Sequence, residues 1–210
     1  MTERRDASPL PTDEPDGRKQ RSQESQRRIV AAMLELVASG NLTPSAEQVA
    51  ETANVGLRSV FRHFKDMDTL HQEISDSIAV AIQAIIKQPF KATDWRGQVL
   101  ELVDRRAAVF EKTTNFLLAG QVQRHRSAFL QAGHARFVGM LRQILHDLLP
   151  AESARHTDMV EAVDLLLSFE AWHRLRADQK LDVDRAKQVL KQAIASLLDR
   201  HDLHRHDKGA

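Results

Sequence analysis

The sequence predicts an all-α protein of about nine helices, and three observations carry that prediction. From residue 29 onward, apolar side chains recur every three or four residues, which places them on one face of a helix. No segment sustains the alternation of apolar and polar side chains that is typical of a half-buried strand. Prolines, glycines and capping residues divide the helical pattern into separate elements.

The composition is that of an ordinary soluble protein, with 42% hydrophobic and 28% charged residues in a chain of 210. Thirty Lys and Arg against 29 Asp and Glu give a formal net charge of +1, so any nucleic-acid surface has to be local. The absence of cysteine excludes disulfides, thiolate metal sites and a cysteine nucleophile. No apolar run approaches the ~20 residues of a membrane-spanning helix, and the N-terminus lacks the apolar centre of a secretory signal. We therefore expect a cytoplasmic protein without membrane contact.

Residues 1–22 are predicted to be a disordered N-terminal arm. They hold three of the six prolines, charges of both signs and almost no apolar side chain. Such a segment cannot bury enough surface to offset the entropy lost on ordering. Its end is basic, with Arg18, Lys19 and Arg21, which suits a solvated linker or a contact with DNA.

Residues 23–65 are predicted to form a domain of three short helices. The first begins near Gln26 and ends at Gly40, and its apolar face consists of Ile29, Val30, Met33, Leu34, Leu36 and Val37. The second follows Pro44, where Ser45 and Gln48 fit a capping box. Its inner face consists of Val49, Ala50 and Ala53.

The third helix follows a tight turn, Asn54-Val55-Gly56, and completes a helix-turn-helix unit. Because the second and third helices of such a unit cross at a steep angle, a small residue is needed in the turn. We expect Val60, Phe61 and Phe64 to point inward. The third helix of this unit lies in the major groove of DNA and presents its exposed face to base edges.

Residues 66–200 are predicted to form a second, larger helical domain. Asp66 caps a fourth helix over 67–87, and further helices are expected over 95–112, 114–123, 127–149, 157–177 and 182–199. The tail, residues 201–210, is polar. The helix over 157–177 is apolar nearly all round, so it should be buried on two sides.

The stretch from Ile29 to Leu70 resembles the N-terminal signature of the TetR family of bacterial transcriptional regulators. The matching elements, in the family's order and spacing, are Gly40, Val49-Ala50, Ala53, Val55, Val60-Phe61-Arg62-His63-Phe64 and Leu70. The resemblance implies a DNA-binding domain followed by a helical domain for ligand binding and dimerisation. It also implies a transcriptional regulator, most often a repressor, that binds a palindromic operator as a dimer and is released by a small effector.

The DNA-contacting positions of the family fall here on Ser45, Leu57, Arg58, Ser59, Phe61, Arg62, His63 and Lys65. Arg58 and Arg62 lie one turn apart, and each suits bidentate pairing with a guanine edge. Two positions depart from the family pattern. Phe61 lacks the hydroxyl of the tyrosine often found there, and Met67 stands near a position where lysine is common.

The second domain supplies the candidate effector and dimer residues. Bulky and polar side chains available to line a pocket are Phe110, Phe116, Phe129, His134, Phe137, Met140, Phe169, Trp172 and His173. They predict a largely apolar ligand with one or two hydrogen-bonding groups. The family places the dimer contact on the last two long helices, which here suggests Val160, Val163, Leu167, Val183, Leu190, Ile194 and Leu197.

Two other readings compete with an effector-controlled regulator. The first is a helical DNA-binding regulator that has no small-molecule effector and is controlled by a protein partner. The remote one is a ferritin-like carboxylate enzyme, since Glu170 and His173 have the required spacing, but such sites need two Glu-x-x-His motifs and only one is found. No phosphate loop or catalytic triad spacing is present, so we expect no enzyme activity, no cofactor and no bound metal.

Overall fold

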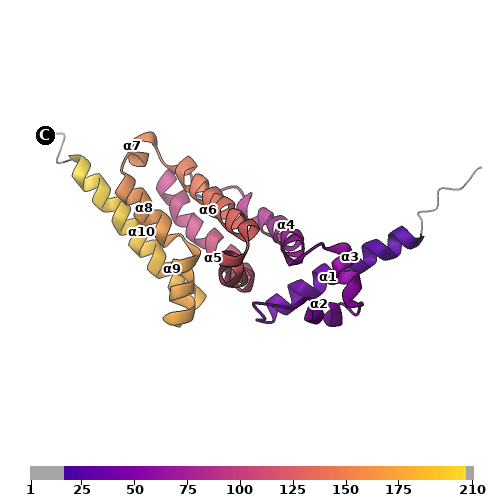
Figure 1. The fold of residues 1–210 in the computed structure, drawn as a ribbon. Helices are drawn as coiled ribbons and strands as arrows, with labels where there is room; N and C mark the ends of the chain where they lie inside the picture. Colours follow the sequence, from indigo (N-terminus) through magenta and orange to yellow (C-terminus); the bar gives the residue numbers. More distant parts are fainter. Residues whose placement is uncertain (1–16, 207–210) are drawn as a thin grey trace, which may run out of the picture.

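The computed structural model describes residues 17–206, and these form helices and turns with no strand. Figure 1 shows an elongated molecule with a small N-terminal head at one end and a larger helical body at the other. Two separate hydrophobic cores correspond to these parts. Most of the predicted arm, residues 1–16, and the last four residues lie outside the described part of the chain.

The head consists of α1 (Gly17–Ala38), α2 (Ala46–Thr52), α3 (Leu57–His63) and the start of α4 (Met67–Ile86). Its core is built around fully buried residues from every one of these helices: Ile29, Met33, Val49, Val60 and Leu70. Gly40 lies in the turn that follows α1 and has φ +98°, a conformation that favours glycine.

The capping signals of the head have the predicted roles. The Ser45 hydroxyl accepts the N–H of Gln48, whose side chain accepts the N–H of Ser45, so α2 begins with a complete capping box. Asp66 caps α4 by accepting the N–H of Thr69 at 2.8 Å.

Two expectations for the head were wrong. Residues 17–22 belong to α1 and not to a disordered arm. Phe61 does not point inward: its side chain is 49% exposed, and α3 packs on the head through Val60 and Phe64. Successive residues of a helix are about 100° apart, so Phe61 lies on a different side of α3 from Val60, which fills the core.

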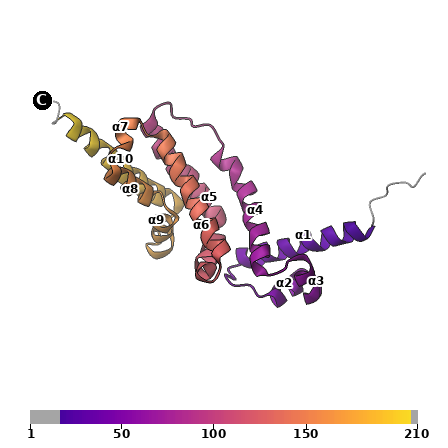
Figure 2. The same ribbon diagram turned by 45° about the horizontal axis from the view of Figure 1, so that its top comes forward.

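The body contains α5 (Trp95–Gln123), α6 (Ala128–Leu148), α8 (Thr157–Leu166), α9 (Phe169–His173) and α10 (Val183–His206), together with the second half of α4. Short elements connect them: η1 (Arg124–Arg126), α7 (Ala151–Ala154) and the π-helical turn η2 (Arg174–Asp178). In both ribbon views α8 lies along α10, and α5 lies beside α6 (Figures 1 and 2).

Three helix boundaries in the body differ from the prediction. The segments 95–112 and 114–123 form one helix, α5, because the hydroxyls of Thr113 and Thr114 donate to the carbonyls of Val109 and Phe110 and do not end the helix. The segment 157–177 is broken after Leu166, where the Ser168 hydroxyl caps α9. The last helix, α10, continues past residue 199 to His206.

Arg106 on α5 joins three helices inside the body. Arg106 is 5% exposed, and its guanidinium donates to the carbonyl oxygens of Leu167 at 2.8 Å and Leu141 at 2.7 Å. The carboxylate of Asp164 lies 3.8 Å away. These contacts satisfy carbonyls at the end of α8 and within α6, and so fix α5 against both.

The head and body meet along α5. The Asn115 amide donates to the carbonyl of Ala38 at 2.8 Å, and the Gln123 amide donates to the carbonyl of Leu42 at 3.0 Å. The His71 Nε2 of α4 lies 3.1 Å from the side-chain amide oxygen, Oε1, of Gln123. Ala119 of α5 is buried in the head core between these polar contacts. The α5 helix therefore contacts the head at the end of α1, in the loop that follows it, and at the start of α4.

Candidate nucleic-acid interface and cavities

The outer face of α3 is the first candidate functional surface. Leu57 and Phe61 are 38% and 49% exposed, and Arg58 and Arg62 are also exposed. The two pairs have i, i+4 spacing, so each pair lies along one side of the helix. Ser59 is half-buried, and its hydroxyl lies 3.5 Å from an Arg62 guanidinium nitrogen. The surface offers two cations beside two apolar groups.

The remaining predicted DNA-contacting residues have different surroundings. Ser45 and Lys65 are exposed. His63 is half-buried, and its Nε2 is buried without a hydrogen-bond partner. Burial lowers the pKa of His63, and the nearby Arg62 charge lowers it further. This imidazole is therefore neutral at pH 7 and brings no charge to the surface.

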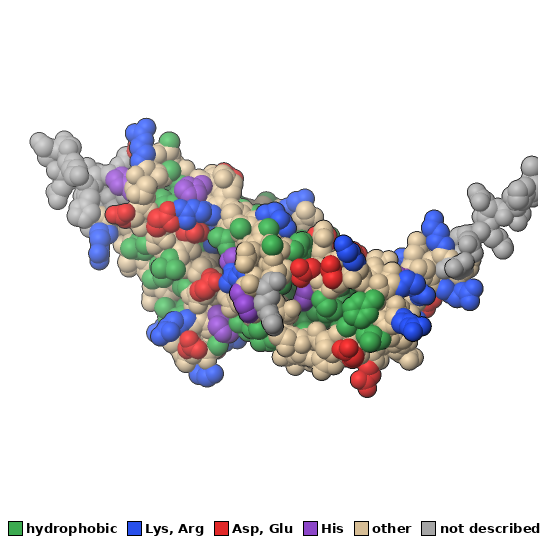
Figure 3. Space-filling view, in the orientation of Figure 1, with side chains coloured by type: hydrophobic (Ala, Val, Ile, Leu, Met, Phe, Trp, Pro, Cys, Tyr) green, Lys and Arg blue, Asp and Glu red, His purple; other side chains and the backbone are tan. Residues whose placement is uncertain are grey.

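The N-terminal part of α1 is a second basic surface. Residues 17–28 include no apolar side chain, and Lys19, Arg21, Arg27 and Arg28 are all exposed. The first fully buried residue of this helix is Ile29. Lys and Arg side chains gather at this end of the molecule in the space-filling view (Figure 3), where α1 extends beyond the head. The sequence prediction recognised the charge of this segment but not its helical form.

A cavity of about 230 Å³ lies between α5, α6 and the junction of α8 with α9. Three of the predicted pocket residues, His134, Phe137 and Phe169, line it. Phe110 lies behind Phe169, with ring centroids 5.5 Å apart in an edge-to-face contact. Burial lowers the pKa of His134, so its ring is neutral at pH 7.

Arg106 also lines this cavity and was not among the predicted residues. Burial lowers the pKa of Arg106 to about 10, and the carboxylate of Asp164 opposes that shift. Its Nε is buried without a partner. The sequence held no signal for this role, because an arginine on a long helix is usually exposed.

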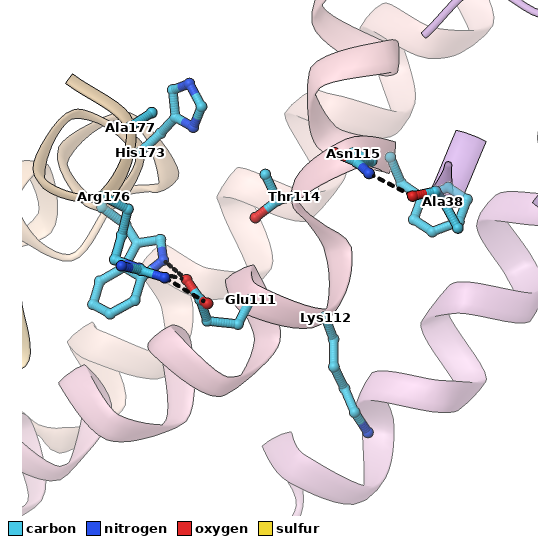
Figure 4. Close-up of a pocket in the computed structure, with 10 residues that line it drawn as sticks. Ala38, Glu111, Lys112, Thr114, Asn115, His173, Arg176 and Ala177 are labelled. Carbon is cyan, nitrogen blue, oxygen red and sulfur yellow. Dashed lines mark hydrogen bonds and ion pairs between the residues drawn. The ribbon is translucent and has the colours of Figure 1, made fainter. Parts of the chain in front are cut away.

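A wider cleft of about 430 Å³ lies between the head and the body. It holds three more predicted pocket residues: Phe116, Trp172 and His173. Figure 4 shows Glu111 and Arg176 facing each other on one wall and Asn115 reaching Ala38 on the other. Phe129 and Met140 line neither hollow, and the Met140 side chain is 39% exposed. The predicted single pocket is thus divided between two hollows.

Five of the seven predicted dimer residues lie inside the protomer. Val160, Val163, Leu167, Leu190 and Ile194 are each at most 5% exposed in the single chain. These side chains are already covered within the single chain, because α8, α10 and α5 pack together through them. Val183 and Leu197 are half-buried, and Leu165 on the outer side of α8 is 66% exposed. The apolar periodicity identified the faces of α8 and α10 that pack inside the protomer.

The site described above lies on a TetR-like fold: a helix-turn-helix head joined through α4 and α5 to a helical body. Among solved structures, a TetR transcriptional regulator from Rhodococcus sp. RHA1 matches 86% of this chain and 97% of its own, with a TM-score of 0.53 and 18% sequence identity. The comparison confirms the all-α, TetR-like prediction. No protein-family model and no curated protein matches the sequence.

Two further properties of the described residues bear on other protein classes. Over residues 17–206 no helix has the length and apolar character needed to cross a bilayer. Within the same range no group of three or more His, Asp or Glu side chains is placed to hold a metal ion. Glu170 accepts a hydrogen bond from Gln121, and the His173 ring stacks on Phe169.

Proposed function

We propose that this chain is a sequence-specific DNA-binding transcriptional regulator, acting as a homodimeric repressor on a palindromic operator. The observation that carries the proposal is the exposed α3 face, where Arg58 and Arg62 stand beside Leu57 and Phe61 on a helix-turn-helix head. Arginine pairs with guanine edges, and apolar side chains pack on thymine methyl groups. Each good bidentate pair contributes about 1–3 kcal/mol of discrimination between bases.

Contacts to the DNA backbone surround this reading face. Lys65 and the amides at the start of α2 near Ser45 suit phosphate oxygens, which set register and not sequence. The basic first turns of α1 add Lys19, Arg21, Arg27 and Arg28, with a single opposing carboxylate at Glu24. A helix segment with no apolar face gains little from packing on its own chain. Its exposed cations are therefore proposed to bind DNA phosphates.

The dimer contact is proposed for the outer side of α8 and α10. Leu165 supports this because a leucine that is 66% exposed on a body helix leaves apolar area unburied. The half-buried Val183 and Leu197 lie on the partnering helix α10. A two-fold dimer presents two α3 helices to half-sites about 34–36 Å apart, or somewhat farther if the DNA is adapted.

The effector site is proposed for the cavity lined by His134, Phe137 and Phe169. A volume of about 230 Å³ suits a small, largely apolar molecule, and the neutral His134 supplies a hydrogen-bonding group. Ligand-induced movement of α5 reaches the head through Asn115 and Gln123. Coupling between the ligand and DNA is expected to be about 1–3 kcal/mol.

Fluorescence anisotropy tests the DNA-binding function. The protein is titrated against the DNA upstream of its own gene and against a scrambled duplex, at two salt concentrations. Tight, salt-sensitive binding with a preference of about 1,000-fold or more is expected. Arg62→Ala should remove the preference, whereas Arg155→Ala, an exposed arginine of the body, should not. Equal binding of wild type to both duplexes, across fragments of the surrounding genome, contradicts the proposal.

A further inference from the structure

The cleft between head and body is a second candidate ligand site, separate from the proposed effector cavity. Its volume of about 430 Å³ lies in the range of small-molecule sites. One wall comes from α5, another from α9 and η2, and Ala38 at the end of α1 completes it. A ligand here contacts both modules at once.

Most polar groups of the cleft are already paired. The Glu111 carboxylate accepts from the Trp172 indole N–H at 3.0 Å and from the Arg176 guanidinium at 2.9 and 3.2 Å. The Thr114 hydroxyl donates to the carbonyl of Phe110. Arg176 and Glu111 therefore neutralise each other and form a rigid wall (Figure 4).

Lys112 is the cleft residue whose charge is unmatched. It is exposed, and within residues 17–206 no acceptor is found for its ammonium group. Lys112 and His173 extend to different ends of the cleft in Figure 4. Since Glu111 balances Arg176, the lining has an excess of one positive charge. The half-buried ring of Phe116, one helical turn after Lys112 on α5, supplies apolar area, whereas Trp172 is 2% exposed and lies behind the Glu111 side chain.

We propose that this cleft binds a small organic anion with a flat apolar body, whose negative group pairs with Lys112. The excess positive charge selects an anion over a cation, and the accessible Phe116 ring beside Lys112 favours a planar hydrocarbon part over a hydrated inorganic ion. The hydrogen bond from Asn115 to Ala38 lies on the side of the cleft opposite Glu111 and Arg176. Occupation of the cleft therefore acts directly on the junction between the modules.

Three nearly isosteric probes test the charge selection: benzoate, neutral benzamide and cationic benzamidine. The chain has two tryptophans, so a Trp95→Phe variant leaves Trp172 in the cleft wall as the reporter of binding. Benzoate should change the Trp172 emission in a saturable manner. Benzamide should bind more weakly, and benzamidine should produce no saturable change at the same concentrations.

Two lysine variants locate the anion. Lys112→Gln should weaken benzoate binding about fivefold, the range of a solvent-accessible ion pair, and Lys112→Arg should restore it. Lys87→Gln, an exposed lysine at the end of α4, is the matched control and should have no effect. Equal binding of benzoate and benzamidine, or an unchanged affinity in Lys112→Gln, overturns the proposal. So does loss of benzoate binding in Phe137→Ala, because Phe137 lines the other cavity.

The effect on DNA rests on the proposed function and is measured separately. Saturating benzoate should shift the operator affinity of the wild type and leave that of Lys112→Gln unchanged. If the chain binds no operator, the fluorescence titration still decides whether the cleft is an anion site. Benzoate binding without any shift in operator affinity overturns the coupling.

Discussion

The Asn115 side chain of α5 donates a 2.8 Å hydrogen bond to the carbonyl oxygen of Ala38, the last residue of α1. This bond ties the end of a head helix to the middle of a body helix, 77 residues later in the chain. The carbonyls at the end of a helix lack intrahelical partners, so the Asn115 amide supplies one from outside the head.

Replacing Asn115 by Ala should loosen the head without unfolding either core. The expected loss of unfolding free energy is about 1 kcal/mol, the net contribution of one hydrogen bond. Hydrogen exchange should increase at the end of α1 and at the adjoining part of α5. Gln131→Ala, an exposed glutamine on α6, provides the control. Unchanged exchange at both places contradicts a mechanical role for Asn115.

Replacing Phe61 by Tyr should increase operator affinity. The Phe61 ring is 49% exposed, so a para hydroxyl enters solvent and requires no repacking of the head. A hydrogen bond from that hydroxyl to a phosphate should tighten binding about threefold to tenfold. Anisotropy titrations of wild type and variant measure the ratio. A weaker complex places Phe61 against a base or a methyl group and not beside the backbone.

Neutralising the first turns of α1 should reduce the salt dependence of DNA binding. Each phosphate contact contributes about 0.9 to the slope of log affinity against log salt concentration. The quadruple variant with Gln at Lys19, Arg21, Arg27 and Arg28 should therefore lower the slope by up to about 3.6. Sequence preference should be retained, because phosphate contacts do not read bases. A slope identical to that of the wild type contradicts phosphate contacts by these four side chains.

Replacing Arg106 by Met should destabilise the body strongly. The substitution leaves the carbonyls of Leu167 and Leu141 without their donors in a buried place. We expect a loss of about 2–4 kcal/mol, measured by urea unfolding. Arg155→Met, at an exposed position, should change the stability by less than about 0.5 kcal/mol. Comparable stability of the Arg106 variant and wild type rules out a structural role for the guanidinium.

The junction between α4 and α5 should weaken in acid. Burial lowers the pKa of His71 below its usual 6.5, although Gln123 and Asp68 oppose the shift. The unfolded chain therefore takes up the proton first, so the stabilising contribution of neutral His71 is present above pH 6.5 and is lost as the pH falls below that value. His63 and His134 have pKa shifts in the same direction.

Unfolding titrations across this pH range, with His71→Gln beside wild type, isolate the His71 contribution. Glutamine keeps a hydrogen-bonding side chain but has no proton to bind. The variant should lose stability less steeply in acid, with the remaining slope due to the other two histidines. Identical slopes contradict the assignment to His71.

The sequence predicted the head more completely than the body. Ser45, Gln48 and Asp66 act as caps because capping depends on residues three positions apart. Helical periodicity predicted an inward Phe61, whereas the family resemblance placed it among the DNA-contacting residues on the outer side of α3. The inward prediction followed the periodicity and was wrong. In the body, Thr113 and Thr114 looked like a helix boundary, yet their hydroxyls bond to the preceding turn. Ser168 looked like an interior residue and is a cap.

Long-range contacts explain the remaining differences. The apolar stripes of α8 and α10 showed that one face of each helix is buried, but a stripe does not show whether its own chain or a partner covers that face. Arg106 could not be identified because its partners lie 35 and 61 residues away. The two hollows likewise combine residues of α5 with α6 in one case and with α9 and η2 in the other.

Because α5 is long, a small change in its direction at one end moves the other end through a large distance. A helix of 29 residues is about 43 Å long, and its C-terminal part contacts the head through Asn115 and Gln123. A tilt of about 5° at one end therefore moves the other by ~4 Å, close to the rise of one base pair. If the dimer is two-fold, the heads move in opposite senses and the displacement doubles. A small rearrangement in the body is then enough to take the two reading helices out of step with their half-sites.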